Sequence, residues 1–232
     1  MDNLITSTLF INQFKNLFMK KILFVTTMLV LIILFFTGCK KNQETDYSSL
    51  FKNTVWTGAF NYDNAAAEPY SLQFNENGNF TWREFLGIFS GNWKIEGKQI
   101  ILSFINGHSF KADISNDQML NNIQNNVSNG WSVTSGQLNA ATEQVLDGTV
   151  WKAANNNPAK LIFSSGLRVD ATGSIFSVFG SLGINVNYTR EAGAVLFSTS
   201  LYNFFSIIVP DGKSMIVLNK SLNPGGLKLF RQ

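Results

Sequence analysis

The chain of 232 residues repeats itself at a nearly constant spacing. The run Leu50 to Trp56 (LFKNTVW) returns 95 positions later as Val145 to Trp151 (VLDGTVW). The later matches keep the same order, pairing Leu72-Gln73-Phe74 with Leu161-Ile162-Phe163, Asn92-Trp93-Lys94 with Asn187-Tyr188-Thr189, Ile101-Leu102-Ser103 with Leu196-Phe197-Ser198, Met119-Leu120 with Met215-Ile216, and Gly130 to Val133 with Gly226 to Leu229. Similarity that holds its order over a whole unit indicates a duplicated domain. We therefore predict two similar units, residues 50–136 and 145–232, joined by a linker at 137–144.

Both units show the pattern of an all-β fold. Ile100, Leu102 and Phe104 alternate with more polar residues, and a period of two places such side chains on one face of a strand. Asn77-Gly78 and Asp211-Gly212 supply the positive-φ positions of tight hairpin turns. In the first unit we expect strands near residues 55–60, 70–75, 79–84, 91–96, 99–105, 109–114, 119–123 and 131–134. The fold class predicted is two tandem antiparallel meanders of about eight short strands each, closed as small barrels or curled sheets.

A helical turn is expected before the tryptophan of each unit. Leu50 to Lys52 and Val145 to Asp147 occupy equivalent positions, and we expect each turn to plug one end of its unit. Trp56 and Trp151 are expected to pack in the two cores, because large aromatic side chains dominate small cores.

The N-terminal region has the features of an export signal. Met19-Lys20-Lys21 is a short cationic start, and Ile22 to Phe36 is an uncharged apolar run of 15 residues. Small residues follow at Thr37 and Gly38. This order is typical of a secretory signal peptide, so we assign residues 1–38 to one and expect translation to start at Met19. The alternative is an uncleaved anchor helix, but a helix that spans a membrane needs about 20 apolar residues.

The end of this signal, Phe36-Thr37-Gly38-Cys39, resembles the lipobox of bacterial lipoproteins. The resemblance implies cleavage between Gly38 and Cys39 and a diacylglycerol with its fatty acid, such as palmitate, on the Cys39 sulfur. Cys39 is the only cysteine, which agrees with a lipidation site. Residues 39–49 then form the lipidated cysteine and a polar tether. Lys40 and Lys41 stand where an aspartate marks inner-membrane retention in some lipoproteins, which favours the outer membrane or cell surface.

The charge of the body argues against a nucleic-acid partner. The whole chain has 18 Lys and Arg against 15 Asp and Glu, and four of these charges lie before Cys39. The remainder is close to neutral, whereas a nucleic-acid partner requires a clustered basic face.

The runs Val55-Trp56-Thr57-Gly58, Leu72 to Trp82 (LQFNENGNFTW) and Gly91 to Leu102 (GNWKIEGKQIIL) are similar to the small lipocalin-like domains of bacterial lipoproteins. The similarity covers residues 53 to about 105 well and the second unit loosely. It implies meander barrels whose early tryptophan closes the base. In this chain Gly58 follows Trp56, whereas in the full lipocalin pattern the glycine precedes the tryptophan.

An apolar set of residues is the candidate binding surface. These residues lie in strand connections that lack clean alternation, where they would form a mouth for a hydrophobic ligand or partner: Phe85, Leu86, Ile88, Phe89, Phe176, Phe179, Tyr202, Phe204 and Phe205. The alternative is that they pack between the two units. Phe204–Val209 and Met215–Leu218 favour this alternative, because they are apolar on both strand faces.

No residue pattern indicates catalysis or a metal. His108 is the only histidine and has no cysteine or paired carboxylate beside it. Glu76, Glu84 and Glu96 are interpreted as surface residues rather than as a hydrolytic carboxylate pair. We expect a non-enzymatic binding or interaction module without a cofactor, anchored to a membrane. The alternatives are a structural or surface-antigen lipoprotein without a ligand and, third, an envelope hydrolase.

Overall fold

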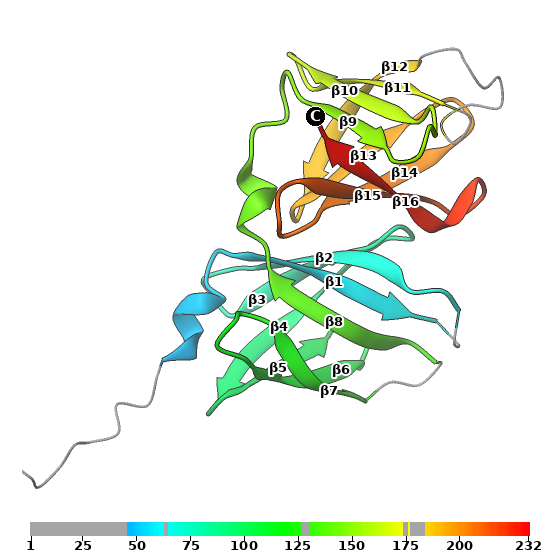
Figure 1. Ribbon diagram of the computed structural model, residues 1–232. Coiled ribbons are helices and arrows are strands. Elements are labelled where there is room, and N and C mark those ends of the chain that lie inside the picture. Colours follow the sequence, from blue (N-terminus) through cyan, green and yellow to red (C-terminus); the bar gives the residue numbers. More distant parts are fainter. Residues whose placement is uncertain (1–45, 63–64, 127–129, 174–175, 177–183) are drawn as a thin grey trace, which may run out of the picture. The chain divides into compact units, whose positions relative to one another are not determined.

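The computed structural model describes residues 46–62, 65–126, 130–173, 176 and 184–232. They contain two eight-stranded antiparallel sheets and two short 3-10 helices, η1 (Tyr47–Leu50) and η2 (Ala140–Glu143) (Figure 1). Among these residues no helix is both long and apolar enough to cross a membrane. The all-β prediction of two tandem barrel-like units is confirmed.

The first sheet is a meander in chain order, with β1 and β8 as neighbours. Its strands are β1 (Val55–Asn61), β2 (Glu68–Phe74), β3 (Asn79–Arg83), β4 (Ile88–Glu96), β5 (Gln99–Phe104), β6 (Ser109–Ile114), β7 (Leu120–Asn126) and β8 (Ser132–Leu138). All eight overlap the ranges expected from sequence. The last strand extends to Leu138, so the first unit runs two residues into the predicted linker.

The second sheet is a closed barrel in which β16 pairs with β9. Its strands are β9 (Val150–Ala153), β10 (Lys160–Ser164), β11 (Arg168–Thr172), β12 (Ile184–Glu191), β13 (Ala194–Ser198), β14 (Asn203–Ile208), β15 (Ser214–Asn219) and β16 (Asn223–Arg231). The first barrel closes less completely at β7 and β8. There the Asn125 side chain both donates to the Val133 carbonyl (3.1 Å) and accepts from its amide (2.8 Å), in place of backbone pairing.

Strand register confirms the internal repeat. Trp56 pairs with Leu72 in the first barrel, and Trp151 pairs with Leu161 in the second. The β4–β5 and β12–β13 pairs agree in the same way, since Trp93 opposes Leu102 and Tyr188 opposes Phe197. One predicted match is wrong by a residue. Leu120 and Met215 are the buried pair at the start of β7 and β15, whereas Met119 is 41% exposed.

Each barrel has its own aromatic core, with a plug at one end. Phe51 follows η1 and stacks on Trp56 at a ring distance of 4.6 Å. Leu146 occupies the equivalent place beneath the second barrel, in a turn rather than a helix. Trp56 and Trp151 are fully buried, so the prediction that they are core residues is confirmed. Tyr47 is also buried, so the body begins inside the segment expected to be tether.

The two barrels share an apolar interface. Both faces of β14 and β15 are buried, because alternate residues face the second barrel's core and the first barrel. A small cluster fills the contact, formed by Ala194, Phe205, Ile207 and Leu218 with Phe85, Leu196 and Ile216 packed against it. The apolar character of Phe204–Val209 and Met215–Leu218 is therefore explained by packing between the units.

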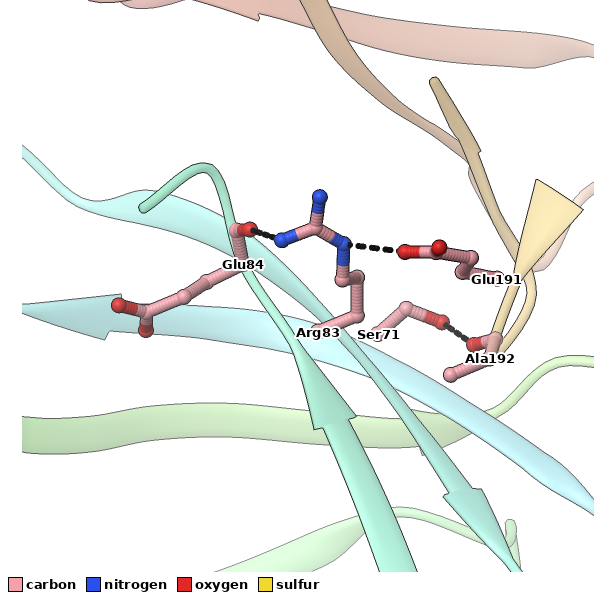
Figure 2. Close-up of polar contacts among 5 residues, drawn as sticks. All are labelled: Ser71, Arg83, Glu84, Glu191 and Ala192. Carbon is pink, nitrogen blue, oxygen red and sulfur yellow. Dashed lines mark hydrogen bonds and ion pairs between the residues drawn. The ribbon is translucent and has the colours of Figure 1, made fainter. Parts of the chain in front are cut away.

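Polar contacts hold the same interface (Figure 2). The Arg83 guanidinium forms an ion pair with Glu191, with a distance of 2.9 Å from Nε to Oε2, and the Ser71 hydroxyl donates to the Ala192 carbonyl. From the linker, the buried Asn139 amide donates to Thr57 Oγ1 (2.9 Å) and to the Ile208 carbonyl (2.6 Å).

Candidate binding pocket at the mouth of the first barrel

The end of the first barrel opposite η1 holds a pocket of about 180 Å³. In an up-and-down meander every second connection lies at the same end. The β1–β2, β3–β4, β5–β6 and β7–β8 connections therefore meet there and bring together residues distant in the sequence. Five aromatic residues line the pocket, namely Tyr62, Trp82, Phe89, Phe104 and Trp131. Asn106 and His108 add polar groups at its edge.

The aromatic walls brace one another. Trp131 packs edge-on against both Trp82 and Phe104, each at a ring distance of 5.3 Å. Trp82 forms the fully buried floor and stacks on Tyr70 at 3.8 Å. The His108 ring lies nearly parallel to Trp131 at 6.1 Å. Such mutual contacts hold a pocket open in a defined shape.

A buried carboxylate lies behind these rings. Glu84 is 1% exposed, and its two oxygens accept hydrogen bonds from the Tyr62 hydroxyl (2.9 Å) and from Trp82 Nε1 (3.1 Å). Burial raises the pKa of Glu84, and these two hydrogen bonds oppose that rise. Burial and the neighbouring carboxylate also raise the pKa of Tyr62, so its hydroxyl remains a donor.

The backbone around Glu84 is tied to the barrel interface. Arg83 Nη1 donates to the Glu84 carbonyl at 2.8 Å, while the same guanidinium pairs with Glu191 of the second barrel. Figure 2 shows the Glu84 side chain pointing away from Arg83. The interface therefore fixes the turn that carries the carboxylate.

The second barrel also contributes a charge near the pocket. Lys220, directly after β15, pairs with Glu68 at 2.8 Å, and its Nζ lies 5.7 Å from the centre of the Tyr62 ring. Glu68 and Lys220 both act on the pKa of Glu84, in opposite directions.

In the described part of the second barrel, an aromatic side chain is buried in the core where the first barrel has its pocket. Ala171 occupies the register position of Trp82, since Leu161 opposes Ala171 as Leu72 opposes Trp82. Phe176 is fully buried in the same core and packs against Phe204 (5.4 Å) and Phe197 (6.1 Å). Two further hollows, of about 450 and 300 Å³, are more open and are lined by exposed residues such as Arg168, Asn187 and Lys111.

The predicted apolar surface divides into three parts. Leu86 and Ile88 are exposed in and beside the β3–β4 connection, next to the pocket-lining Phe89. Phe85 and Phe205 pack in the barrel interface. Phe176 and Phe204 are buried in the second core, with the half-buried Tyr202 against it. The buried members do not form a surface, because the barrel closes around them.

Some predicted site residues lie outside the described part of the chain. These are Gly38 and Cys39, assigned to signal cleavage and lipidation, and Phe179 of the apolar set. Within the described part, no group of three or more His, Cys, Asp or Glu side chains is placed to hold a metal ion.

Sequence reasoning missed most of the pocket. Glu76 and Glu96 are exposed as expected, but the interpretation of Glu84 as a surface residue is wrong. The position of Glu84 two residues after the core residue Trp82 could have indicated its burial, because residues i and i+2 of a strand lie on the same face. Tyr62, His108 and Trp131 become neighbours only through the barrel.

No protein-family model, curated protein or solved structure matches this chain. The fold defines the class: a tandem pair of eight-stranded antiparallel units, of which the second is a closed barrel and the first is nearly closed, with a pocket at the mouth of the first.

Proposed function

We propose that the chain is an exported, membrane-anchored lipoprotein whose first barrel is a non-enzymatic binding module for a small hydrophobic molecule. The observation that carries the binding role is the mouth pocket. Its volume of about 180 Å³ exceeds the roughly 150 Å³ of an engineered cavity that holds benzene. Its walls are aromatic with few polar groups, which is the usual make-up of a small-molecule site.

An envelope protein is the second kind of partner that this end of the barrel could engage. Leu86 and Ile88 are 63% and 53% exposed beside the pocket. Apolar side chains at the rim of an aromatic pocket would add contact area for either a larger ligand or a protein segment.

The anchor is supported by the sequence alone. Thr37-Gly38-Cys39 follows a 15-residue apolar run, and Lys40 and Lys41 favour the outer membrane or cell surface. Metabolic labelling with radioactive palmitate tests this part. Cys39→Ala should abolish labelling and leave unprocessed precursor, and equal label in both proteins would refute the lipid anchor.

A direct test of the pocket compares two phenylalanine truncations. Phe89→Ala removes a half-buried pocket wall, whereas Phe230→Ala removes a 40% exposed ring from the second barrel. Benzyl alcohol, an uncharged one-ring probe, is titrated into each protein by calorimetry. We expect Phe89→Ala to weaken binding and Phe230→Ala to leave it unchanged. Absence of binding to the wild-type chain would refute the pocket as a one-ring site.

A structural lipoprotein without a ligand is the second candidate, and the burial of Phe176 in the described core of the second barrel favours it. The Phe176 ring is fully buried there and packs against Phe204. The two roles divide between the barrels: the first offers a site, and the second supports it through Arg83–Glu191 and Lys220–Glu68.

A further inference from the structure

We propose that the mouth pocket selects small organic cations, such as a quaternary or protonated amine, over neutral molecules of the same shape. This inference rests on the proposed binding function of the same pocket. Three features carry it: the ring walls, the carboxylate behind them and the local charge balance.

Aromatic rings carry negative charge density on their faces and positive charge density at their edges, so a cation is attracted to a ring face. Aromatic residues arranged around one space attract a cation through their quadrupoles, with each contact contributing about 0.5–2 kcal/mol. Tyr62, Phe89, Phe104 and Trp131 supply such walls around a volume of about 180 Å³. That volume suits a compact head group rather than an extended chain.

The carboxylate strengthens this preference without touching the ligand directly. Both Glu84 oxygens are engaged, one by Tyr62 and one by Trp82. A hydrogen bond donated to an anion polarises the donor, so these two rings become more electron-rich. A sugar or other polyol would need exposed acceptors for its hydroxyl groups, and the Glu84 carboxylate is only 1% exposed.

The charges around the pocket do not cancel. Glu68 and Glu84 carry two negative charges when ionised, and Lys220 supplies one positive charge. Arg83 is paired with Glu191, so it does not offset the remaining charge. One further cation would restore balance in this partly buried region, where charges interact more strongly than in water.

The chain already places a cation of its own in this environment. Lys220 Nζ lies 5.7 Å from the centre of the Tyr62 ring and pairs with Glu68. This contact shows that the Tyr62 ring and the Glu68 carboxylate accept a positive charge. It also predicts competition, because Lys220 and a bound cation repel each other.

The experiment uses the full-length protein in a non-ionic maltoside detergent. Choline and its uncharged isostere 3,3-dimethylbutan-1-ol differ in charge but hardly in shape. Tryptophan emission and calorimetry follow both titrations at low salt. We expect choline to bind about tenfold more tightly than the alcohol. Equal affinities would overturn the cation preference and leave the binding function standing, whereas failure of choline, the alcohol and benzyl alcohol would overturn both.

Two charge variants move the affinity in opposite directions. Glu84→Gln should weaken choline binding about fivefold or more, and Lys220→Gln should strengthen it about threefold, because each removes one nearby charge. The readout is the ratio of choline affinity to alcohol affinity, because a change in pocket shape would alter the binding of both ligands. Glu96→Gln, at an exposed turn position, is the matched control. Unchanged choline affinity in Lys220→Gln would contradict the charge argument even where Glu84→Gln fails to fold.

Discussion

The internal repeat allows the energetic role of one buried N–H group to be measured against an equivalent position. Trp56 and Trp151 are both fully buried at the same place in their barrels. Trp151 Nε1 donates to Thr149 Oγ1 at 2.9 Å, whereas Trp56 Nε1 has no hydrogen-bond partner among the described residues. Replacing each tryptophan by phenylalanine removes a similar part of the ring. At Trp151 the change also removes a hydrogen-bonded N–H group, whereas at Trp56 it removes an unpaired one.

The expected difference follows from hydrogen-bond energetics. Trp151→Phe loses a hydrogen bond with a net contribution of about 0.5–1.5 kcal/mol. Trp56→Phe removes an unpaired buried donor, which relieves about 1–3 kcal/mol of desolvation cost. The packing loss is shared, so Trp56→Phe should be the more stable variant by about 2 kcal/mol or more. In a body of this size that difference corresponds to about 4–8 °C in Tm.

Urea and thermal unfolding of Asp46–Gln232, the compact unit of the chain, followed by circular dichroism, provide the measurement. Fluorescence is unsuitable because each variant removes a reporter tryptophan. Trp56→Ala and Trp151→Ala serve as reference variants, each expected to cost about 3–5 kcal/mol. Equal losses in the two phenylalanine variants would refute the reasoning, because they would mean that the Trp56 N–H is satisfied in solution.

Three further results are expected. Burial raises the pKa of Glu84 above its ordinary 4.5, so the stability that its protonated form contributes is present at low pH and is lost as pH rises through the raised pKa. In thermal melts from pH 4 to 8, the wild type should therefore lose stability relative to Glu84→Gln. Parallel stability profiles of the two proteins would contradict this. In urea unfolding, Gly193→Ala should destabilise the protein more than Gly97→Ala. Both glycines have a positive φ, but only at Gly193 would the new Cβ meet the other barrel, 2.5 Å from Val55 Cγ1. Equal losses of stability would exclude a tight interface at Gly193. Phe176→Ala should cost about 3–5 kcal/mol and open a space in the second barrel, detectable as new benzene binding by NMR.

Local patterns were enough to place the strands. Alternation in Ile100, Leu102 and Phe104 and turns such as Asn77-Gly78 act over a few residues, so their outcome could be read before the fold was known. The repeat added the equivalence of Trp56 and Trp151, which strand register then confirmed. The prediction paired Met119 with Met215, although Leu120 is the buried equivalent of Met215. An alignment that is wrong by one residue moves every side chain of a strand to the opposite face.

The pocket depended on contacts between distant segments. Tyr62, Glu84, His108 and Trp131 lie in four different connections, and only barrel closure brings them to one end. The sequence determined two similar barrels with buried tryptophans, because strand periodicity and turn chemistry are local. The tertiary structure decided that the first barrel has an aromatic pocket at its mouth and that Phe176 is buried in the core of the second. Trp82 and Ala171 share a register position, and in the second barrel Phe176, from the turn just after β11, is buried against Phe204.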